Sequence, residues 1–330
     1  MATTKNSKNV LKIVTACLVI VFIASGVLLG LEIWDKNHGK FDEQHMAEET
    51  VIYNGHEYVL KNNVETFLVM GLDKFDGASS ADSYNNDKQA DFLMLVVFDN
   101  DAKKYSAIHI NRDTMANIDV LGVAGDKVDI VKKQIALAHT YGNGKNVSCQ
   151  NTADAVSRLL NDVKVNHYIS LSLDSVGVFN DLVGGVEVTV LDDFSGIDNT
   201  LIKGQKVTLN GTQALNYVRE RYGMEDSTNA TRMNRQKQYL EALYAKTQKK
   251  MESDGEFVIK ATSQMADYII SDRTATQLQE IGKKLNKYKF CGFLEIEGES
   301  KKGKEFIEFY PKADSIDKLV IDLFYQIKNN

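Results

Sequence analysis

Residues 92–98 read Phe-Leu-Met-Leu-Val-Val-Phe, which places seven apolar side chains in a row. A strand that is apolar at every position has to be covered on both faces, because its side chains alternate between the two sides of a sheet. A second short apolar run, 66–70, ends at Gly71 and predicts another buried strand. These runs indicate an α/β fold in which helices cover both faces of the sheet.

Strands and helices alternate along the rest of the chain. Residues 105–110 follow a turn at Asn100-Asp101 and are expected to pair with 92–98 as a hairpin, which makes the sheet mixed. The pattern therefore predicts one three-layer α/β/α domain around a mixed central sheet, spanning 64–330. The other expected elements are helices at 151–160, 173–182 and about 231–250, strands at 165–171 and 186–190, a helix from Gly211 capped by Asn210, and a tail from 257 that reads helix, helix, strand, strand, helix.

The N-terminal segment predicts a membrane anchor. Residues 13–31 carry no charge, and at about 1.5 Å per residue they nearly match a hydrocarbon core of about 30 Å. Lysines precede this span and acidic residues dominate its other side, so we expect 1–12 in the cytoplasm and the chain after Trp34 outside, beginning with a polar stalk at 32–63. A cleaved signal peptide is the alternative, since Ala24-Ser25-Gly26 offers small residues, but the run exceeds the length of about 7–15 residues typical of such a signal.

The charge distribution singles out one stretch. The chain has 330 residues and a formal net charge of -6, which argues against a protein that coats nucleic acid. Four arginines nevertheless lie within 17 residues, at Arg219, Arg221, Arg232 and Arg235. A guanidinium presents a flat fork of donors that matches phosphate oxygens, so the stretch indicates an anion site. A solvated helix face with ion pairs is the alternative interpretation.

The spacing of these arginines sets a geometric condition. Residues two apart share a face in an extended segment but not on a helix, so Arg219 and Arg221 act together only if the helix from Asn210 ends near Val218. Arg232, Arg235 and Gln236 fall on one helical face, at i, i+3 and i+4.

Two aspartates stand at the ends of the apolar strands. Asp73 follows the first strand and Asp91 opens the second, so neighbouring strands would bring both carboxylates to one edge of the sheet, where ligands of α/β proteins bind. Two carboxylates repel each other unless a cation or a proton lies between them. Mg²⁺ suits such a place, because it takes one or two protein carboxylates and leaves positions for phosphate and water. Ordinary turn or cap residues are the alternative.

A third polar segment, Arg112-Asp113, follows directly on the strand that ends at Ile110. Asp113 could hold the guanidinium of Arg112 for a ligand; an Arg–Asp surface pair is the alternative. Five arginines, two aspartates and a glutamine suit a Mg²⁺-bound pyrophosphate. The sequence contains no Ser–His arrangement for acyl transfer, no P-loop and no dinucleotide fingerprint.

In this order, these segments resemble the LytR–CpsA–Psr family. The resemblance covers 64 to about 245 well and the tail more loosely. The segments that carry it are Gly71-Leu72-Asp73, Asp91, Arg112-Asp113-Thr114, Asp181-Leu182-Val183-Gly184-Gly185-Val186, Leu209-Asn210-Gly211 through Tyr217-Val218-Arg219-Glu220-Arg221, and Arg232-Met233-Asn234-Arg235-Gln236.

The resemblance implies a ligase on the outer face of a bacterial cell membrane. Such proteins transfer a glycopolymer from a polyprenyl pyrophosphate carrier to peptidoglycan, forming a phosphodiester, and have an apolar pocket for the lipid tail. By position, Asp73 and Asp91 would hold Mg²⁺ (or Mn²⁺), and Asp91 would also take the proton of the acceptor. The pyrophosphate would be bound by Arg112, Arg219 and Arg221, with Arg232, Arg235 and Gln236 close by and Asp113 in support.

The chain also departs from the family pattern. Gln89 replaces an arginine, which removes a phosphate contact, and Asn111 replaces a proline, which is expected to loosen the turn. Gln134-Ile135-Ala136 replaces a Lys-Ile-Asn element of the family pattern, and Asn229 replaces an aspartate. Two other functions therefore stay open, a non-catalytic binder of lipid-linked pyrophosphates and a lipid pyrophosphate hydrolase. The sequence does not name the glycopolymer or the oligomeric state, and it leaves a bond between Cys149 and Cys291 open.

Overall fold

The computed structural model describes residues 50–72, 86–220, 229–254, 256–304 and 306–328. The expected cytoplasmic tail, the span at 13–31 and the first part of the stalk lie outside these residues. None of the helices in the described ranges is long and apolar enough to cross a bilayer.

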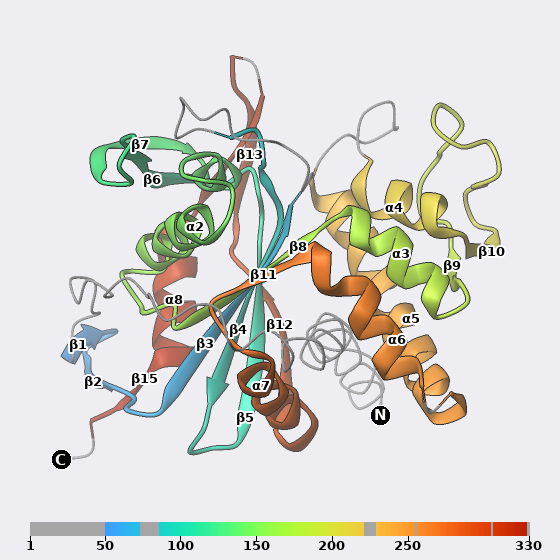
Figure 1. The fold of residues 1–330 in the computed structure, drawn as a ribbon. Helices are drawn as coiled ribbons and strands as arrows, with labels where there is room; N and C mark the ends of the chain where they lie inside the picture. Colours follow the sequence, from blue (N-terminus) through green and yellow to red (C-terminus); the bar gives the residue numbers. More distant parts are fainter. Residues whose placement is uncertain (1–49, 73–85, 221–228, 255, 305, 329–330) are drawn as a thin grey trace.

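A six-stranded sheet forms the centre of the domain, in the order β11-β8-β3-β4-β5-β12 (Figure 1). The pairs β3–β4, β4–β5 and β8–β11 are antiparallel, whereas β3–β8 and β5–β12 are parallel. The expected mixed sheet is therefore confirmed. Its strands are β3 (Val64–Leu72), β4 (Ala90–Asp99), β5 (Lys104–Ile110), β8 (His167–Ser172), β11 (Ile269–Ser271) and β12 (Lys289–Glu295).

Helices cover both faces of this sheet, as the apolar run 92–98 predicts. Met94, Val96 and Phe98 pack into one core, and Leu93, Leu95 and Val97 pack into another on the opposite face. The first core is closed by α3 (Asp174–Leu182), α4 (Gly211–Arg219), α5 (Asn229–Ser253), α6 (Phe257–Met265) and α7 (Ala275–Lys287). The second is closed by the 3-10 helix η2 (Ile135–Thr140), α2 (Asn146–Leu159) and α8 (Ala313–Phe324), on the left in Figure 1.

Smaller sheets surround this core, and one of them corrects the expected domain boundary. Residues 50–60, expected in the polar stalk at 32–63, form a hairpin that pairs with the C-terminal strand and packs on the second core. The domain therefore includes residues before 64. The sequence pattern after residue 257 predicted two strands, so it missed β11, one strand of the 298–311 hairpin and β15. The smaller sheets comprise β1 (Thr50–Tyr53), β2 (His56–Leu60) and β15 (Tyr325–Ile327), β6 (Met115–Leu121) and β7 (Lys127–Gln134), β9 (Val186–Thr189) and β10 (Lys206–Leu209), and β13 (Gly298–Lys302) and β14 (Ile307–Pro311).

The two cysteines at 149 and 291 are unpaired. Cys149 is buried in α2, with its Sγ 3.6 Å from Nε2 of His139, and burial raises the pKa of the thiol to about 12. Cys291 is exposed on β12. Cys149 is therefore a packing residue rather than half of a disulfide.

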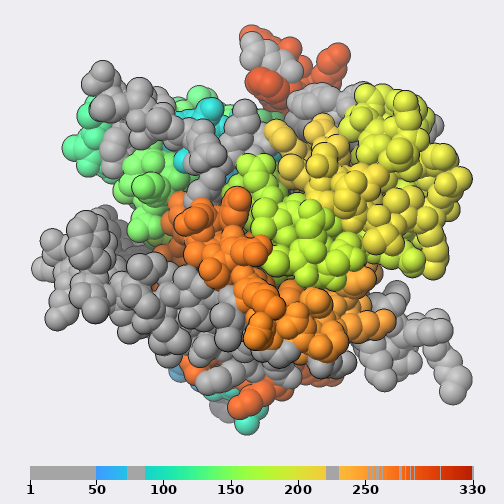
Figure 2. Space-filling model, turned by 45° about the vertical axis from the view of Figure 1, so that its right-hand side comes forward, coloured from blue at the N-terminus to red at the C-terminus, as the bar shows by residue number. Residues whose placement is uncertain are grey.

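Because of the strand directions, the ends of several strands lie at one edge of the central sheet, which we call the upper rim. The last residues of β3, β5, β8 and β12 lie there, together with the first residues of β4. The β13–β14 hairpin stands out from the molecule above this edge (Figure 1, Figure 2). The upper rim is where the sequence predicts the ligand site.

Close packing of α3 and α4 fixes the helix that leads to Arg219. The helix begins at the expected cap, because the Asn210 side chain accepts a hydrogen bond of 2.9 Å from the Gln213 backbone N–H, and the Gln213 side chain accepts one of 3.0 Å from Asn210 N. A Cβ built on Gly211 would lie 2.8 Å from the carbonyl oxygen of Gly177 and 2.5 Å from Asp181 Oδ2. The Asp181 and Asn210-Gly211 motifs therefore meet in space, and glycine permits the contact.

We expect Gly211→Ala to lower the free energy of unfolding by about 1–3 kcal/mol, because the new methyl group pushes α4 away from the α3 backbone. Thr212→Ala, at the exposed next position of α4, is the matched control and should change stability by less than about 0.5 kcal/mol. Urea unfolding followed by circular dichroism measures both. Equal stabilities of the two variants would contradict the packing constraint.

Candidate functional site

Asp91 lies at the centre of the described part of the upper rim. It is the second residue of β4 and is 8% exposed. Arg112, which follows the end of β5, forms an ion pair with it through Nη1 and Asp91 Oδ1. Arg232 from α5 reaches the same residue, with Nη1 3.8 Å from Asp91 Oδ2 and Nη2 donating a hydrogen bond of 3.3 Å to Asp91 O. Two arginines that are 120 positions apart in the sequence thus converge on one carboxylate, in what we call the arginine–aspartate cluster.

Gln89 and Asp113 orient the guanidinium of Arg112. The Gln89 side-chain oxygen accepts a hydrogen bond from Arg112 Nη2, and Asp113 Oδ1 lies 3.6 Å from Arg112 Nε. The replacement of an arginine by Gln89 therefore supplies an acceptor for Arg112. Asp113 is 1% exposed, so the surface Arg–Asp pair considered from the sequence is not what forms.

The turn that presents Arg112 is held without the proline of the family pattern. Asn111 Oδ1 accepts a hydrogen bond of 2.9 Å from the Asp113 N–H, and Asn111 O accepts hydrogen bonds from Thr114 N and Oγ1 at 3.0 and 2.6 Å. Gln134, the last residue of β7, donates from Nε2 to Asp113 Oδ1 at 3.0 Å and to Ile307 O at 2.7 Å. These hydrogen bonds hold the turn where the family pattern has a proline ring.

Arg235 and Gln236 connect α5 to the end of α4. Arg235 is fully buried, with its guanidinium 5.2 Å from the ring centre of Phe194. Its Nε lies 3.4 Å from Asp192 Oδ2, and its Nη2 donates to Glu220 O. Gln236 Nε2 donates to Val218 O at 3.0 Å. In the described geometry these two side chains therefore contact the chain around α4 rather than Asp91.

Arg219 is the last residue of α4, and Glu220 has extended backbone angles of φ -69° and ψ 141°. The helix thus ends within one residue of the position that joint action of Arg219 and Arg221 requires. Arg221 itself lies outside the described residues, as does Asp73. The pairing of Arg219 with Arg221 and of Asp73 with Asp91 stays a prediction.

Among the described residues, one side chain at the upper rim, Asp91, suits a magnesium ligand. No group of three or more His, Cys, Asp or Glu side chains is present in the described part of the chain. Mg²⁺ does not need such a group, since one or two carboxylates and substrate phosphates suffice. Within the described residues no hydrogen bond reaches Asp91 Oδ2, and Arg232 is 3.8 Å away from it. Asp91 therefore fits as one carboxylate ligand.

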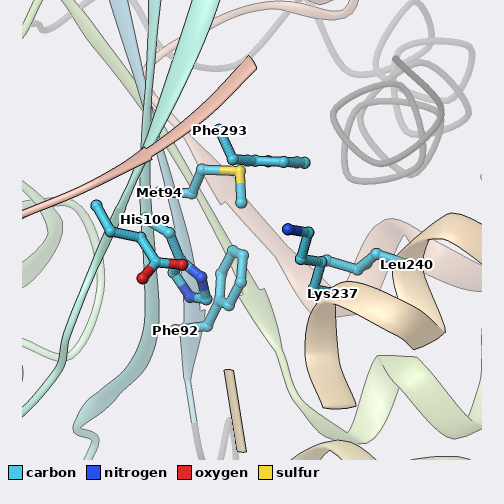
Figure 3. Close-up of a pocket in the computed structure, with 7 residues that line it drawn as sticks. Phe92, Met94, His109, Lys237, Leu240 and Phe293 are labelled. Carbon is cyan, nitrogen blue, oxygen red and sulfur yellow. The ribbon is translucent and has the colours of Figure 1, made fainter. Parts of the chain in front are cut away.

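An apolar hollow adjoins the cluster between α5 and strands β4, β5 and β12 (Figure 3). Its cavity of about 10 Å³ has room for one water molecule at most, so the hollow is too small to hold a lipid tail. The sequence interpretation missed this hollow, although His109 interrupts an apolar strand and Lys237 directly follows Gln236. The lining residues are Phe92, Met94, His109, Lys237, Leu240, Phe293 and Glu295.

His109 is the buried titratable group of this hollow. Its ring centre lies 5.0 Å from that of Phe92. Burial is the largest cause that lowers the pKa of the imidazole from 6.5 to about 3, and the nearby charges of Arg232 and Lys237 contribute to the same shift. His109 is therefore neutral at pH 7 and adds no third positive charge beside the arginines.

We expect His109 to make the folded protein sensitive to acid. The unfolded chain binds the proton near pH 6.5 and the folded chain only near pH 3, so the free energy of unfolding falls as the pH falls from 6.5 toward 3. The slope from this group is about 1.4 kcal/mol per pH unit, and His109→Gln should remove it. Urea unfolding at pH 6, 5 and 4 measures the slope. If variant and wild type have the same slope, His109 takes up its proton in the folded state.

The fold agrees with what comparison with known proteins finds. TagU of Enterococcus faecalis, a polyisoprenyl-teichoic acid–peptidoglycan teichoic acid transferase, is 28% identical over 244 residues, which are 72% of this chain and 71% of that protein. LcpA of Corynebacterium glutamicum, a cell wall biosynthesis protein, is 29% identical over 170 residues, which are 46% of this chain but 32% of that protein.

Solved structures show the same fold. Bacillus subtilis TagV superposes with a TM-score of 0.56 at 24% sequence identity, over 80% of this chain and 97% of that one. TagT bound to LI-WTA gives a TM-score of 0.58 at 17% identity, over 87% and 98%. The LytR_cpsA_psr family profile matches residues 33–323, which include every segment on which the resemblance rests. The chain therefore belongs to the LytR–CpsA–Psr family.

Proposed function

We propose that this protein transfers a glycopolymer from a polyprenyl pyrophosphate carrier to peptidoglycan, forming a phosphodiester. The observation that carries the proposal is the buried contact of Arg112 and Arg232 with Asp91 at the upper rim. Relatives named as teichoic acid–peptidoglycan transferases support the reaction class. With the predicted span at 13–31, the transfer takes place on the outer face of the cell membrane.

The reaction requires charge neutralisation more than covalent chemistry from the protein. An acceptor hydroxyl oxygen forms a bond to the phosphorus next to the glycan, while the bond from that phosphorus to the bridging oxygen breaks. Polyprenyl phosphate leaves with the electron pair of the broken bond. Arg112 and Arg232 neutralise the phosphate oxygens, and we assign the same task to Arg219 and Arg221 by their position in the family motif.

Asp91 is the residue that we assign to the acceptor proton. Its Oδ2 has no hydrogen bond from the described residues, whereas Asp113 accepts one from Gln134. Asp91 and Asp73 would also hold Mg²⁺. When bound, this ion would offset the negative charge of the pyrophosphate oxygens. Asp91 additionally orients both arginines, so that the donors are fixed before the substrate arrives.

Turnover is favoured over mere binding because the departures from the family pattern are compensated. Gln89, Asn111 and Gln134 each make a hydrogen bond that holds Arg112 or Asp113 in place. Asn229 begins α5, and its side chain lies outside the described residues. No observation favours the hydrolase, so it is an outcome of the assay below.

We expect Arg112→Ala to lower kcat by about 10²–10³-fold, because a donor to the developing charge is lost. The assay combines the full chain in detergent with a lipid pyrophosphate-linked glycan, Mg²⁺ and a peptidoglycan oligomer. The control is Arg273→Ala, which removes an arginine bonded to His167 at the opposite edge of the sheet, and it should leave kcat within about twofold of wild type. Tight binding without a ligated product would indicate a binder, and free polyprenyl phosphate without ligation would indicate a hydrolase.

We expect metal removal by EDTA to stop ligation, and Asp91→Asn to weaken Mn²⁺ binding by about tenfold or more, because one of two anionic ligands is lost. Electron paramagnetic resonance of Mn²⁺ measures this affinity directly in the presence of pyrophosphate. Asp113→Asn is the matched control, because that carboxylate is bound by Gln134. Equal Mn²⁺ affinities of wild type and Asp91→Asn would exclude Asp91 as a ligand.

A further inference from the structure

A group of aromatic and charged side chains lies on the β13–β14 hairpin, beside the turn that presents Arg112. Tyr310 of β14 is the ring at its centre. Lys301 of β13 places its Nζ 5.5 Å from the centre of this ring, and Lys132 of β7 places its Nζ 6.0 Å from it. A cation over an aromatic face is held there electrostatically, so the ring fixes both ammonium groups on the surface. We call these three side chains the hairpin platform.

The hairpin platform is joined directly to the turn that carries Arg112. Phe309, which precedes Tyr310, donates a backbone hydrogen bond of 2.9 Å to the carbonyl oxygen of Asp113. Gln134 donates from Nε2 to the β14 backbone at 2.7 Å and to Asp113 Oδ1 at 3.0 Å, so it ties β14 to the same turn. Given the usual spacing of Cα atoms along and between strands, the Cα atoms of Tyr310 and Arg112 lie within about 13 Å of each other.

Lys132 is the cation of the hairpin platform that has no acidic neighbour. Its side chain is exposed, and in the described ranges no carboxylate lies within 4 Å of its Nζ. Lys301, in contrast, lies 3.3 Å from Glu299 Oε2, and Glu308 accepts a hydrogen bond from the Tyr310 hydroxyl. An exposed ammonium group that is held over a ring and is not neutralised suits an external carboxylate, since charge-assisted hydrogen bonds are the strong ones.

A second ring, Phe306, lies at the tip of the same hairpin. It directly precedes β14, and its side chain is 57% exposed. The hairpin stands out from the molecule above the upper rim (Figure 1, Figure 2), so a large polymer can reach it without entering a pocket. Aromatic rings are enriched at contact surfaces, and here one of them is displayed beside fixed cations.

We infer that the hairpin platform binds the peptidoglycan acceptor, with Lys132 and Lys301 holding its carboxylates and Phe306 contacting the apolar face of a sugar ring. The inference rests on the proposed function and deepens it, because it assigns a surface to the second substrate. The ligand class is a glycan of amino sugars that carries peptide carboxylates.

The position of the hairpin favours the acceptor over the donor glycan. The acceptor is an extended network, which has to bring one hydroxyl to Asp91 while the rest stays outside the protein. A projecting surface that is one strand away from the turn of Arg112 permits this. The donor is bound through its pyrophosphate, to which the arginines are assigned.

The experiment measures the ligation kinetics of the full chain in a non-ionic detergent with Mg²⁺. The acceptor is a disaccharide–peptide fragment of peptidoglycan, used unmodified and with its carboxylates converted to amides. Acceptor and donor concentrations are varied in turn, and isothermal titration measures direct binding of both fragments. Circular dichroism checks that every variant keeps the wild-type fold.

The variants separate charge, ring and position. Lys132→Met removes one ammonium group and keeps a flexible side chain. Tyr310→Leu removes the ring that holds both lysines, and Tyr310→Phe keeps the ring without the hydroxyl. Phe306→Ala removes the ring at the tip. Lys164→Met is the matched control, since it makes the same change at an exposed position before β8, at the opposite edge of the sheet.

We expect Lys132→Met to raise the KM for the unmodified fragment about tenfold and to weaken its binding by the same factor, the effect of one charged hydrogen bond. The kcat and the KM for the donor should change by less than about twofold, because no group that touches the phosphorus is altered. With the amidated fragment, Lys132→Met and wild type should have equal KM values.

The other variants should follow the same assignment. Tyr310→Leu should raise the KM as Lys132→Met does, whereas Tyr310→Phe and Lys164→Met should stay within about twofold of wild type. Phe306→Ala should raise the KM for the unmodified and the amidated fragment by equal factors, because it acts on the sugar and not on the carboxylates.

Equal KM values of wild type and Lys132→Met for the unmodified fragment would overturn the inference and leave the proposed function standing. A rise in the KM for the donor instead would overturn it as well, since the platform would then bind the donor glycan. If the wild type forms no ligated product, the proposed function fails and the titration decides the inference. Binding of the fragment that depends on Lys132 would then support the inference, and the lack of such binding would overturn it.

Discussion

The buried contact of Arg112 and Arg232 with Asp91 is the interaction on which the rest of the upper rim depends. Breaking a buried ion pair leaves an uncompensated charge and costs about 3–5 kcal/mol, so the three side chains hold one another in place. They belong to the end of β5, the start of α5 and the start of β4. The cluster therefore fixes α5 against the sheet. Arg235 and Gln236 of α5 separately join that helix to the end of α4.

The same groups therefore serve stability and binding. A phosphate site built from solvated lysines would have to order its side chains on each binding event, whereas these guanidinium groups are already oriented by Asp91 and Gln89. His109 stays neutral beside them, so the imidazole adds no positive charge at this edge. The arrangement supplies the fixed positive charge that phosphoryl transfer requires.

The central strands β3 and β4 could be predicted from the sequence because they are apolar at most positions, and α4 could be predicted because Asn210 is a strong cap. The short edge strand β11 could not. The β6–β7 hairpin could not, since β7 reads Lys-Val-Asp-Ile-Val-Lys-Lys-Gln and is mostly exposed. Helical spacing placed Arg232 and Arg235 on one face, but their long side chains reach different partners, Asp91 and Asp192. Which partner each one meets depends on strands that come from distant parts of the chain, and spacing alone holds no information about them.

Three of the departures from the family pattern lie around one Arg–Asp pair. Gln89 accepts from Arg112, Asn111 holds the backbone of Asp113, and Gln134 holds the Asp113 side chain, so three changes distant in sequence support one Arg–Asp pair. Each of them viewed alone suggests a weakened site. An arginine at position 89 in this chain would direct a second guanidinium at Arg112 Nη2, which now donates to an oxygen. The three replacements are thus consistent with a site that keeps its charge and geometry by a different set of hydrogen bonds.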